Sequence, residues 1–259
     1  MDQNNGAAEI QTLKGMRVLI TRPQPQAEKL ANYLSQLGAK AVIMPMLEIC
    51  PCHADELPQP LDLGGYNKII VISTSAAECL FKHKPVNTTN SQWLTLGCGS
   101  GEVLAKHGIQ AKSPTALFTS EALLELPDLE NIAGQRVLLV KGEGGRDLLE
   151  EKLKQSGAEV TSLIVYRRRN PHYDAGTLDR TLEEQGIHAI VATSGQIVTN
   201  LISHCSEAST IRERVLLVPS SRVSDLAKQA GFTRIKRAAS AGDDDIAFAL
   251  MSFVSKFVN

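Results

Sequence analysis

The sequence predicts an α/β protein built from two flavodoxin-like domains, each a parallel sheet with helices on both faces. Short apolar runs of strand type alternate along the chain with segments of helical periodicity, which is the pattern of a doubly wound parallel sheet. This alternation occurs twice, about 120 residues apart. The chain has 259 residues, enough for two domains of ordinary size.

The first strand–helix–strand segment covers residues 16–49. Val18–Ile20 is a short apolar run of strand type. After it, apolar residues recur at helical spacing on one face of an otherwise polar segment: Ala27, Leu30, Ala31, Leu34 and Leu37. Pro23 and Pro25 suit the turn into this helix, and Gly38 suits the position after its last turn.

A second copy of this pattern follows later in the chain. The matched segments are Arg17–Ile20 with Arg136–Leu139 and Gly38-Ala39 with Gly157-Ala158 (119 residues apart), Ile70–Thr74 with Ile190–Ser194 (120), and Leu104–Lys106 with Leu226–Lys228 (122). A steady separation across strands, turns and helices indicates an internal duplication. Each half then supplies about four strand–helix units.

Charge and composition argue against several classes of function. Lys and Arg total 27 and Asp and Glu 28, so the net charge is −1, whereas a dedicated nucleic-acid-binding protein usually carries a basic excess. No apolar stretch approaches the ~18 residues that span a bilayer. Residues 1–14 are polar, lack the pattern of a secretory signal and are expected to form a disordered tail. The odd count of five cysteines suits reduced thiols, which favours a cytoplasmic location. We also expect a monomer that binds neither nucleic acid nor membrane.

Cys50, Cys52 and His53 form a cluster that could suggest a metal site. A structural zinc site needs four ligands, usually in two spaced pairs, and no second pair lies at a recognisable distance. A structural or incidental role is therefore favoured over metal binding, and no metal is expected.

Polar loops follow the predicted strands, at the edge where doubly wound sheets bind their ligands. These loops are Thr21-Arg22-Pro23, Ser73-Thr74-Ser75, Gly97–Gly101, Lys141–Arg146, Thr193-Ser194-Gly195 and Pro219–Arg222. Each offers hydroxyls, backbone N–H groups or a cation, and each precedes a predicted helix whose first N–H groups attract anions. Taken singly, a Ser or Thr here is more often a helix N-cap than a ligand contact. Six such loops with Arg22, Lys141, Arg146 and Arg222 among them instead predict a site for a ligand with several negative charges.

The familiar cofactor motifs are missing from the glycine-rich loops. Gly142–Asp147 has Asp where the dinucleotide fingerprint needs its last Gly, and Gly97–Gly101 is spaced differently from that fingerprint. Neither the P-loop pattern nor the Gly-x-Ser-x-Gly of an α/β-hydrolase occurs. The sequence therefore predicts chemistry without a cofactor.

Tyr166 ends an apolar strand and is followed by Arg167, Arg168 and Arg169. A tyrosine there can simply pack its ring and hydrogen-bond its hydroxyl group, with the arginines as a solvated run. As a functional residue it can donate a proton to a leaving hydroxyl or bind a substrate carboxylate. Asp243–Asp245 is expected to begin a helix and is given no catalytic role.

With these motifs laid out, the chain resembles the bacterial uroporphyrinogen-III synthases from about Met16 to its C-terminus. The motifs that carry the resemblance are LITRPQPQAEKLANYLSQLGA, PMLEI, VISTSAA, LGCGSGEVLAKHGI, TSEALLEL, VLLVKGEGGRDLLEEKLKQSGAEV, IVYRR, VATSGQ and VPSSRVSDLAKQAGF. Their order and spacing are specific, although no single motif is decisive.

The resemblance implies two domains joined by a two-stranded connector, with the active site in a cleft between them. Carried over to this chain, residues 15–46 and 173–259 form a discontinuous first domain, and residues 53–164 form the second. Residues 47–52 and 165–172 are then the connector strands, which places the Cys50–His53 cluster at a connector.

The resemblance also implies a reaction that needs no cofactor. Such enzymes cyclise hydroxymethylbilane, a linear tetrapyrrole with eight carboxylates, to uroporphyrinogen III with loss of water, inverting ring D through a spiro intermediate. Tyr166 corresponds to the tyrosine proposed to assist departure of the hydroxyl group. The implied substrate-binding residues are Arg22, Thr74, Ser100, Lys141, Gly142, Arg146, Thr193, Ser194 and Ser221, with Ser220 as the alternative to Ser221 if the loop shifts by one residue.

Two other functions stay open at this stage. A non-catalytic two-domain binder of an anionic metabolite would also duplicate α/β domains, and the lack of an export signal counts against it. A flavin- or nucleotide-binding protein is a weaker possibility, because the fingerprints for those cofactors are missing.

Overall fold

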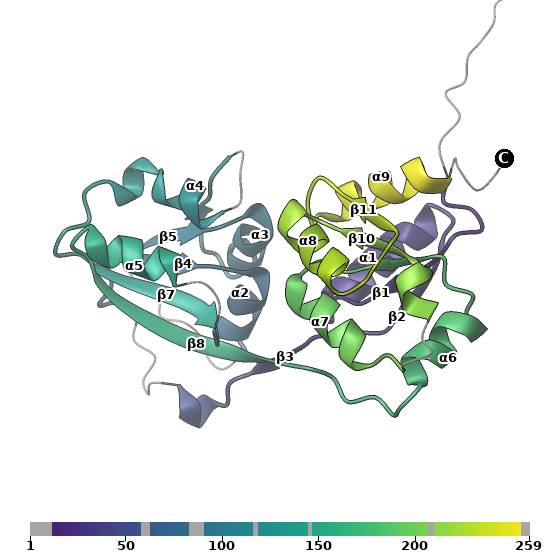
Figure 1. Cartoon of the computed structure of the whole chain (residues 1–259). Coiled ribbons are helices and arrows are strands. Elements are labelled where there is room, and N and C mark those ends of the chain that lie inside the picture. Colours follow the sequence, from purple (N-terminus) through teal and green to yellow (C-terminus); the bar gives the residue numbers. More distant parts are fainter. Residues whose placement is uncertain are drawn as a thin grey trace, which may run out of the picture. The chain divides into compact units, whose positions relative to one another are not determined.

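A computed structural model describes residues 12–57, 63–82, 91–115, 119–144, 147–206 and 210–254. The chain divides into two compact units, which are considered separately (Figure 1). Unit 1 comprises Met1–Glu48 and Arg169–Asn259, and unit 2 comprises Ile49–Arg168. Unit 1 is therefore assembled from two separate parts of the chain.

Unit 1 contains a five-stranded sheet in the order β11-β10-β9-β1-β2. Its strands are β1 Arg17–Ile20, β2 Lys40–Ile43, β9 Ala189–Val191, β10 Val215–Val218 and β11 Ile235–Arg237. All four neighbouring pairs run parallel. The central strands are continuous apolar runs because helices cover both of their faces.

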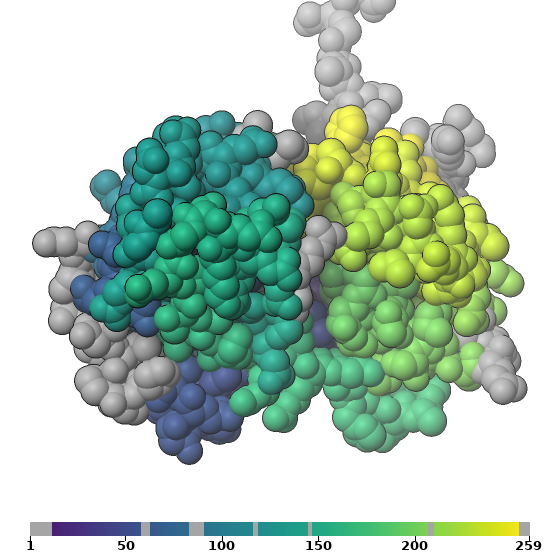
Figure 2. Space-filling view, turned by 60° about the vertical axis from the view of Figure 1, so that its left-hand side comes forward, coloured from purple at the N-terminus to yellow at the C-terminus, as the bar shows by residue number. Residues whose placement is uncertain are grey.

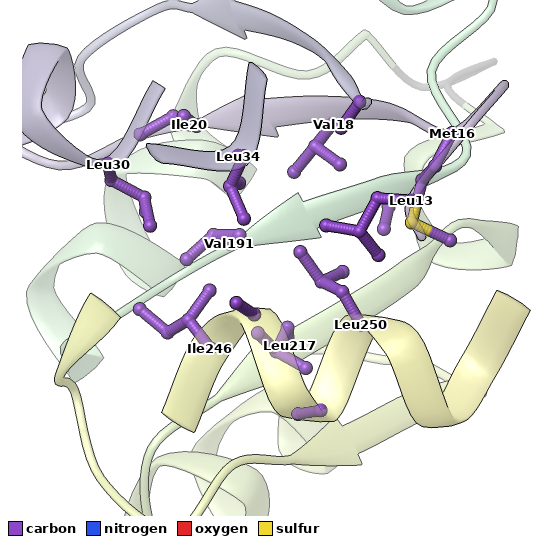
Figure 3. Close-up of a cluster of buried hydrophobic side chains, with 14 of the residues drawn as sticks. Leu13, Met16, Val18, Ile20, Leu30, Leu34, Val191, Leu217, Ile246 and Leu250 are labelled. Atoms are coloured by element: carbon purple, nitrogen blue, oxygen red, sulfur yellow. The ribbon is translucent and has the colours of Figure 1, made fainter. Parts of the chain in front are cut away.

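The helices of unit 1 form two cores, one on each face of this sheet. They are α1 Gln26–Gln36, α6 Thr177–Glu184, α7 Gly195–Ser203, α8 Ser221–Gln229 and α9 Asp243–Val254, with a short 3-10 helix at Thr210–Glu213. Strand alternation divides β1 between the cores: Val18 and Ile20 pack with α1 and α9, and Leu19 packs with α6, α7 and α8. Figure 3 shows the first of these cores, where Leu30 and Leu34 of α1 and Leu250 of α9 point into the same apolar cluster.

The start of the described chain corrects one expectation. Residues 1–14 were expected to form a disordered tail, but Leu13 is fully buried in the first core of unit 1, beside Met16 (Figure 3). The backbone N–H of Leu13 also donates to the carbonyl oxygen of Leu37 at 2.7 Å. Burial of this side chain and the hydrogen bond to Leu37 together offset the ordering of the residues around Leu13, so packing against this core extends to a residue before the first strand.

Unit 2 contains a six-stranded sheet in the order β3-β8-β7-β4-β5-β6. Its strands are β3 Glu48–Pro51, β4 Lys68–Val71, β5 Gln92–Thr95, β6 Ala111–Lys112, β7 Arg136–Gly142 and β8 Glu159–Arg169. The pairs formed by β4, β5, β6, β7 and β8 run parallel. The α/β class and the parallel sheets predicted from the sequence are thus confirmed.

Helices again cover both faces of the unit 2 sheet. They are α2 Thr74–Leu80, α3 Cys98–Lys106, α4 Ser120–Leu124 and α5 Leu148–Gln155, with 3-10 helices at Ala54–Glu56 and Pro127–Leu129. α2 and α3 share a core with Trp93 and Tyr166, and α4 and α5 share the core on the other face. Tyr166 therefore belongs to the α2 and α3 side of the sheet.

The two sheets carry the internal duplication. The order β2-β1-β9-β10-β11 in unit 1 corresponds to β8-β7-β4-β5-β6 in unit 2, so each unit takes two strands from one copy and three from the other. The matched segments need two corrections. Ile70–Thr74 was aligned with Ile190–Ser194 at a separation of 120, but the N-caps of α2 and α7 are Ser73 and Ser194, which are 121 residues apart. Leu104 was aligned with Leu226, but Leu104 is buried whereas Leu226 is 39% exposed and its neighbour Ala227 is buried. α3 and α8 therefore correspond with a separation one residue larger than the sequence alignment gives.

The chain passes between the two units within the segments expected as connectors, 47–52 and 165–172. β3 begins at Glu48, where the chain passes from unit 1 to unit 2, and β8 ends at Arg169, where it returns. β8 begins well before the expected 165–172 segment and belongs to the sheet of unit 2 over its length. Within the residues that the structure describes, no helix is long and apolar enough to cross a membrane.

Unit 1 combines distant parts of the chain, and Figure 2 shows one face of it. The face of unit 1 turned toward the viewer is formed by residues coloured green to yellow, from the later part of the sequence. The earlier residues of this unit contribute β1 and α1 to its core. The carboxyl ends of β1, β9 and β10 consequently carry residues from positions about 170 to 200 apart in the chain.

Candidate functional site

Five of the predicted site residues follow the carboxyl ends of the three central strands of unit 1. Because β1, β9 and β10 are adjacent and parallel, the residues after them emerge at one edge of the sheet. The residues at this edge are Arg22, Thr193, Ser194, Ser220 and Ser221. The sequence-based expectation that these loops share one end of a sheet is met.

Arg22 already has an acidic partner at this edge. Its Nη1 donates to Oδ1 of Asp243 at 2.6 Å, and its Nη2 donates to the carbonyl oxygen of Ala241 at 3.2 Å. Both charged side chains are mostly buried. Asp243 begins α9, as the sequence predicts, but it also neutralises the cation that was expected to bind an anionic ligand.

Ser194 and Ser220 are the N-caps of α7 and α8. Ser194 Oγ accepts from the backbone N–H of Ile197 at 3.3 Å, and Ser220 Oγ accepts from that of Val223 at 3.4 Å. A hydroxyl oxygen that accepts in this way retains its own O–H for donation. A cap and a carboxylate-binding group are therefore compatible in one serine.

The starts of α7 and α8 lie close together. A Cβ atom added at Gly195 would lie 2.7 Å from Leu226 Cδ1 and 3.9 Å from Arg222 Nη1. Thr193 is half-buried beside this contact, and Ser221 is exposed on the first turn of α8. Hydroxyls, the first N–H groups of two helices and the Arg222 guanidinium are thus gathered at one end of unit 1.

The second group of predicted residues lies at the carboxyl edge of the unit 2 sheet. It comprises Thr74, Ser100, Lys141, Gly142 and Tyr166. A Cβ atom added at Gly99 would lie 3.2 Å from Thr74 Oγ1, so the start of α3 lies against the start of α2. Ser100 is buried in the first turn of α3, which leaves Thr74 as the more accessible hydroxyl group.

Tyr166 is almost fully enclosed, with 1% of its surface exposed. Its Oη accepts a hydrogen bond from Arg168 Nη2 at 2.7 Å and lies 3.3 Å from Ser73 Oγ. The Arg168 guanidinium carbon also stands 5.1 Å from the centre of the Tyr166 ring. The hydroxyl group is therefore held between an arginine and a serine.

Gly142 packs directly against the Tyr166 ring. β7 and β8 change register between Lys141 and Gly142, which pairs Gly142 with Tyr166. A Cβ atom at residue 142 would lie 2.3 Å from Cζ of the ring, far inside ordinary contact distance. The resemblance implies that Gly142 binds substrate, and the structure shows that the missing side chain at this position makes space for the Tyr166 ring.

Lys141 is a buried cation with two acidic neighbours. Its Nζ lies 3.4 Å from Asp147 Oδ1 and 3.8 Å from Glu150 Oε2. Hydrogen bonds from Lys154 and Ser162 lower the pKa of Glu150, and the nearby charge of Lys141 lowers it further. Like Arg22, Lys141 is paired with carboxylates of the protein itself.

Two residues of this group, Ser73 and Arg168, were not among the predicted site residues. Ser73 was noted only as part of its loop, although it is the N-cap of α2 and contacts Tyr166. Arg168 is exposed, as a solvated run predicts, but its guanidinium also donates to the Tyr166 hydroxyl oxygen and, at 3.1 Å, to the carbonyl oxygen of Glu143. Strand alternation could have found it, because residues two apart on a strand lie on the same side.

Arg146 lies outside the described residues.

Within the described parts of the chain, no group of three His, Cys, Asp or Glu side chains is arranged to hold a metal ion. Cys52 of the Cys50–His53 cluster is buried, and burial raises the pKa of its thiol.

Comparisons with known proteins identify the family of this chain. A family model described as uroporphyrinogen-III synthase HemD matches residues 28–247. Uroporphyrinogen-III synthase of Salmonella typhimurium LT2 is 34% identical, and that of Escherichia coli K12 is 32% identical; each alignment covers 91% of this chain and all of the relative.

Solved structures show the same fold. A uroporphyrinogen III synthase mutant from the extremely thermophilic bacterium Thermus thermophilus superposes with a TM-score of 0.60 at 17% identity, covering 93% of this chain and 98% of the other. The enzyme from Helicobacter pylori 26695 also gives a TM-score of 0.60, at 14% identity, covering 92% of this chain and 99% of the other. The sequence match over most of its length shows that this chain belongs to the uroporphyrinogen-III synthase family.

Proposed function

We propose that this chain cyclises hydroxymethylbilane to uroporphyrinogen III in porphyrin and heme biosynthesis. In this proposal Tyr166 donates a proton, and the hydroxyl groups at the carboxyl edges of the two sheets bind the substrate. The observation that carries the activity is the family match over residues 28–247, together with curated synthases 32–34% identical over 91% of the chain. The reaction makes the enzyme a lyase that eliminates water.

The reaction begins with loss of the terminal hydroxyl group of the linear tetrapyrrole. The C–O bond breaks, the oxygen leaves as water after accepting one proton, and an azafulvene remains. The substituted carbon of ring D attacks this centre to give a spiro intermediate. That intermediate fragments and recombines, so that ring D closes in the opposite orientation and the last proton is lost.

The protein has to direct this closure more than to activate the substrate. Hydroxymethylbilane loses hydroxide readily and closes spontaneously without inversion, so the rate advantage must come from holding one folded geometry. Positioning of this kind can supply about 7–11 kcal/mol of a barrier. Rigid N-caps at strand ends suit that task, because their hydroxyl groups are fixed by the helices that they begin.

The eight carboxylates of the substrate are proposed to bind mainly to hydroxyl and N–H donors. In unit 1 the donors are Thr193, Ser194 and either Ser220 or Ser221; in unit 2 they are Thr74 and Ser100, with the Gly142 backbone and Arg146 in the loop that follows β7. Arg22 and Lys141 contribute less net attraction than the sequence suggests, because each is already paired with a carboxylate of the protein. A net charge of −1 is consistent with this mode of binding.

Tyr166 is proposed to give the proton that the departing hydroxyl group needs. Replacing it by Phe keeps the ring against Gly142 and removes only the hydroxyl group. We expect Tyr166→Phe to lower kcat strongly while the thermal unfolding midpoint stays near that of the wild type. An unchanged kcat would remove the catalytic role of this residue.

Ser220 and Ser221 can be separated by comparing stability with substrate affinity. Ser220→Ala removes an N-cap and is expected to cost about 1 kcal/mol of folding free energy. Ser221→Ala removes an exposed hydroxyl group and should leave stability nearly unchanged. Whichever of the two substitutions raises KM beyond its effect on stability identifies the serine that binds substrate.

Other features of the enzyme are proposed on the same basis. We propose a cytoplasmic monomer without nucleic-acid partners, in which residues 47–52 and 165–172 connect a domain of 15–46 with 173–259 to a domain of 53–164. The division of the chain near Glu48 and Arg169 supports these boundaries to within a few residues. The alternative of a non-catalytic binder of an anionic metabolite has no observation in its favour beyond the duplicated α/β architecture.

The activity is tested by supplying enzymatically generated hydroxymethylbilane and separating the oxidised products by isomer. The purified protein should form the type III isomer faster than the spontaneous reaction forms type I. Tight binding of a small anion, with type I as the sole product, would favour the non-catalytic alternative.

A further inference from the structure

We propose that Arg168 is a positioning residue for this reaction, acting through Tyr166 by fixing the direction of its hydroxyl proton. The inference rests on the proposed catalytic role of Tyr166 and extends it to a residue that touches neither the reacting carbon nor the leaving oxygen. All of the groups concerned belong to unit 2.

The direction of the hydrogen bond between Arg168 and Tyr166 is fixed by chemistry. A guanidinium carries N–H donors and no acceptor, so in the 2.7 Å contact Arg168 Nη2 donates and Tyr166 Oη accepts. The Tyr166 proton therefore cannot point toward Arg168. It is left for another acceptor: Ser73 Oγ stands at 3.3 Å, in a contact where either oxygen can donate, and the leaving hydroxyl group of bound substrate is the alternative acceptor.

Ser73 can accept a hydrogen bond from Tyr166 while it remains the N-cap of α2. Its Oγ accepts from the backbone N–H of Ala76 at 3.1 Å, which uses one of its two lone pairs. The second lone pair can accept from Tyr166, and the Ser73 O–H is then left to donate outward from the start of α2. Arg168 therefore leaves the Tyr166 proton available either for Ser73 or for the leaving hydroxyl group of the substrate.

Arg168 is itself held by contacts that a freely solvated side chain would lack. Its Nη1 donates to the Glu143 carbonyl oxygen at 3.1 Å, and its guanidinium lies over the Tyr166 ring. The Glu143 backbone N–H in turn donates to the Tyr166 carbonyl oxygen at 2.8 Å. The turn after β7 and the end of β8 therefore hold the arginine in place above the ring.

The neighbouring Arg167 provides a matched control. It is paired with Glu56 at 2.7 Å and with Glu143 at 3.5 Å, and it makes no recorded contact with the Tyr166 hydroxyl among the described residues. Arg167→Gln and Arg168→Gln remove the same charge from adjacent positions of one strand. A general effect of charge or strand stability would appear in both variants.

The test is a double-mutant cycle on isomer formation. We expect Arg168→Gln to lower kcat about tenfold, the loss of one charge-assisted hydrogen bond, with KM changed less than about twofold. Arg167→Gln should leave both constants near the wild-type values. In the Tyr166→Phe background, Arg168→Gln should cause no further loss, because the group through which it acts is gone. The same factor in both backgrounds, or no effect in the wild type, would overturn the inference.

A spectroscopic measurement tests the contact independently of activity. The chain has four tyrosines, so ring-labelled protein gives four Cζ signals by NMR, and the signal lost in Tyr166→Phe belongs to Tyr166. That signal should move in Arg168→Gln and stay in place in Arg167→Gln; equal behaviour in both variants contradicts the proposed contact. If Arg168→Gln does not fold, Arg168→Lys keeps the charge and should shift the same signal.

The two proposals fail differently. A wild-type protein that forms no type III isomer removes the proposed function, while the NMR comparison still decides whether Arg168 orients the Tyr166 hydroxyl. An active wild-type protein with an additive cycle removes only the proposal for Arg168.

Discussion

Gly142→Ala is the substitution whose consequence the structure determines most closely. The new Cβ atom would lie 2.3, 2.5 and 2.8 Å from Cζ, Cε2 and Cε1 of the Tyr166 ring, where 3.4–4 Å is ordinary contact. The ring would have to retreat by about 1 Å. It is 1% exposed and packs in the core shared by α2 and α3, so such a movement requires its neighbours to shift.

The expected cost follows from two opposing effects. Overpacking a close-packed core usually costs about 1–3 kcal/mol, whereas replacing Gly by Ala restricts the unfolded chain and returns about 0.4–1 kcal/mol. If the overpacking cost is about 3 kcal/mol, the free energy of unfolding should fall by about 2 kcal/mol in total. Displacing a catalytic hydroxyl by about 1 Å is also expected to lower kcat on the order of 100-fold.

Trp93 makes the stability measurement specific to unit 2. It is the one tryptophan of the chain, it is buried, and it packs in the same core as Tyr166. Urea unfolding followed by its fluorescence should show the loss of about 2 kcal/mol in Gly142→Ala. Gly101→Ala is the control, because a Cβ atom there meets only Thr95 Oγ1 at 3.9 Å and a helical position favours Ala.

Two results would contradict the packing of the Tyr166 ring against residue 142. Wild-type stability and kcat in Gly142→Ala would show that the ring does not lie over residue 142. The clash is also expected to disappear when the ring is removed, so Gly142→Ala should cost almost nothing in a Tyr166→Ala background. Equal costs in the two backgrounds would place the effect elsewhere.

Three further predictions concern separate features of the chain. Ser194→Ala should lower the free energy of unfolding of unit 1 by about 1 kcal/mol through loss of the α7 cap and also raise KM, measured by urea unfolding and initial rates; an unchanged KM would leave the serine with capping alone. Hydrogen bonds from Lys154 and then Ser162 lower the pKa of Glu150, so its carboxylate stabilises the fold above the ordinary value of 4.5 and this stabilisation is lost as the pH falls through the lowered pKa. Glu150→Gln should therefore be less stable than the wild type at pH 7 and should converge with it in acid, and a difference independent of pH would contradict this. Burial raises the pKa of Cys79 to about 11, so alkylation at pH 8 followed by mass spectrometry should label the exposed Cys98 and spare Cys79 until the protein is unfolded; similar labelling of both in the folded protein would count against the burial of Cys79.

The sequence predicted those parts of the fold that depend on local periodicity. The apolar stripe from Ala27 to Leu34 is the buried face of α1, and Gly38 adopts a φ of +91° just after that helix, where residues with a side chain are strained. The parallel sheets followed because apolar runs alternated with such helices. These signals are short-range, so the chain displays them before it is folded.

The errors lie where a distant partner decides the outcome. Leu13 looks like part of a polar tail until the core that receives it is known. The alignment of Leu104 with Leu226 matched residue types, but burial on α8 falls on Ala227, one position later. A shift of one residue on a helix turns the side chain by about 100°, so identity of type is a weak guide to facing.

The candidate site was predicted in its residue types and less well in its charges. Hydroxyl groups at strand ends follow from parallel topology, and Ser194 and Ser220 lie where that topology requires. The pairing of Arg22 with Asp243 joins residues 221 positions apart, so the sequence could not show that this cation was already neutralised. The proximity of Arg168 to Tyr166 could have been predicted, because Arg168 stands two residues after Tyr166 on the same strand.

Ring inversion is measured at its product, as the fraction of type III isomer at increasing protein concentration. Spontaneous closure of hydroxymethylbilane supplies type I at a fixed rate, so an enzyme that inverts ring D should raise the type III fraction toward completeness as its concentration increases. We expect that rise for the wild type and a much weaker one for Tyr166→Phe at equal concentration. A product mixture that remains type I at every concentration of folded protein would show that the chain does not invert ring D.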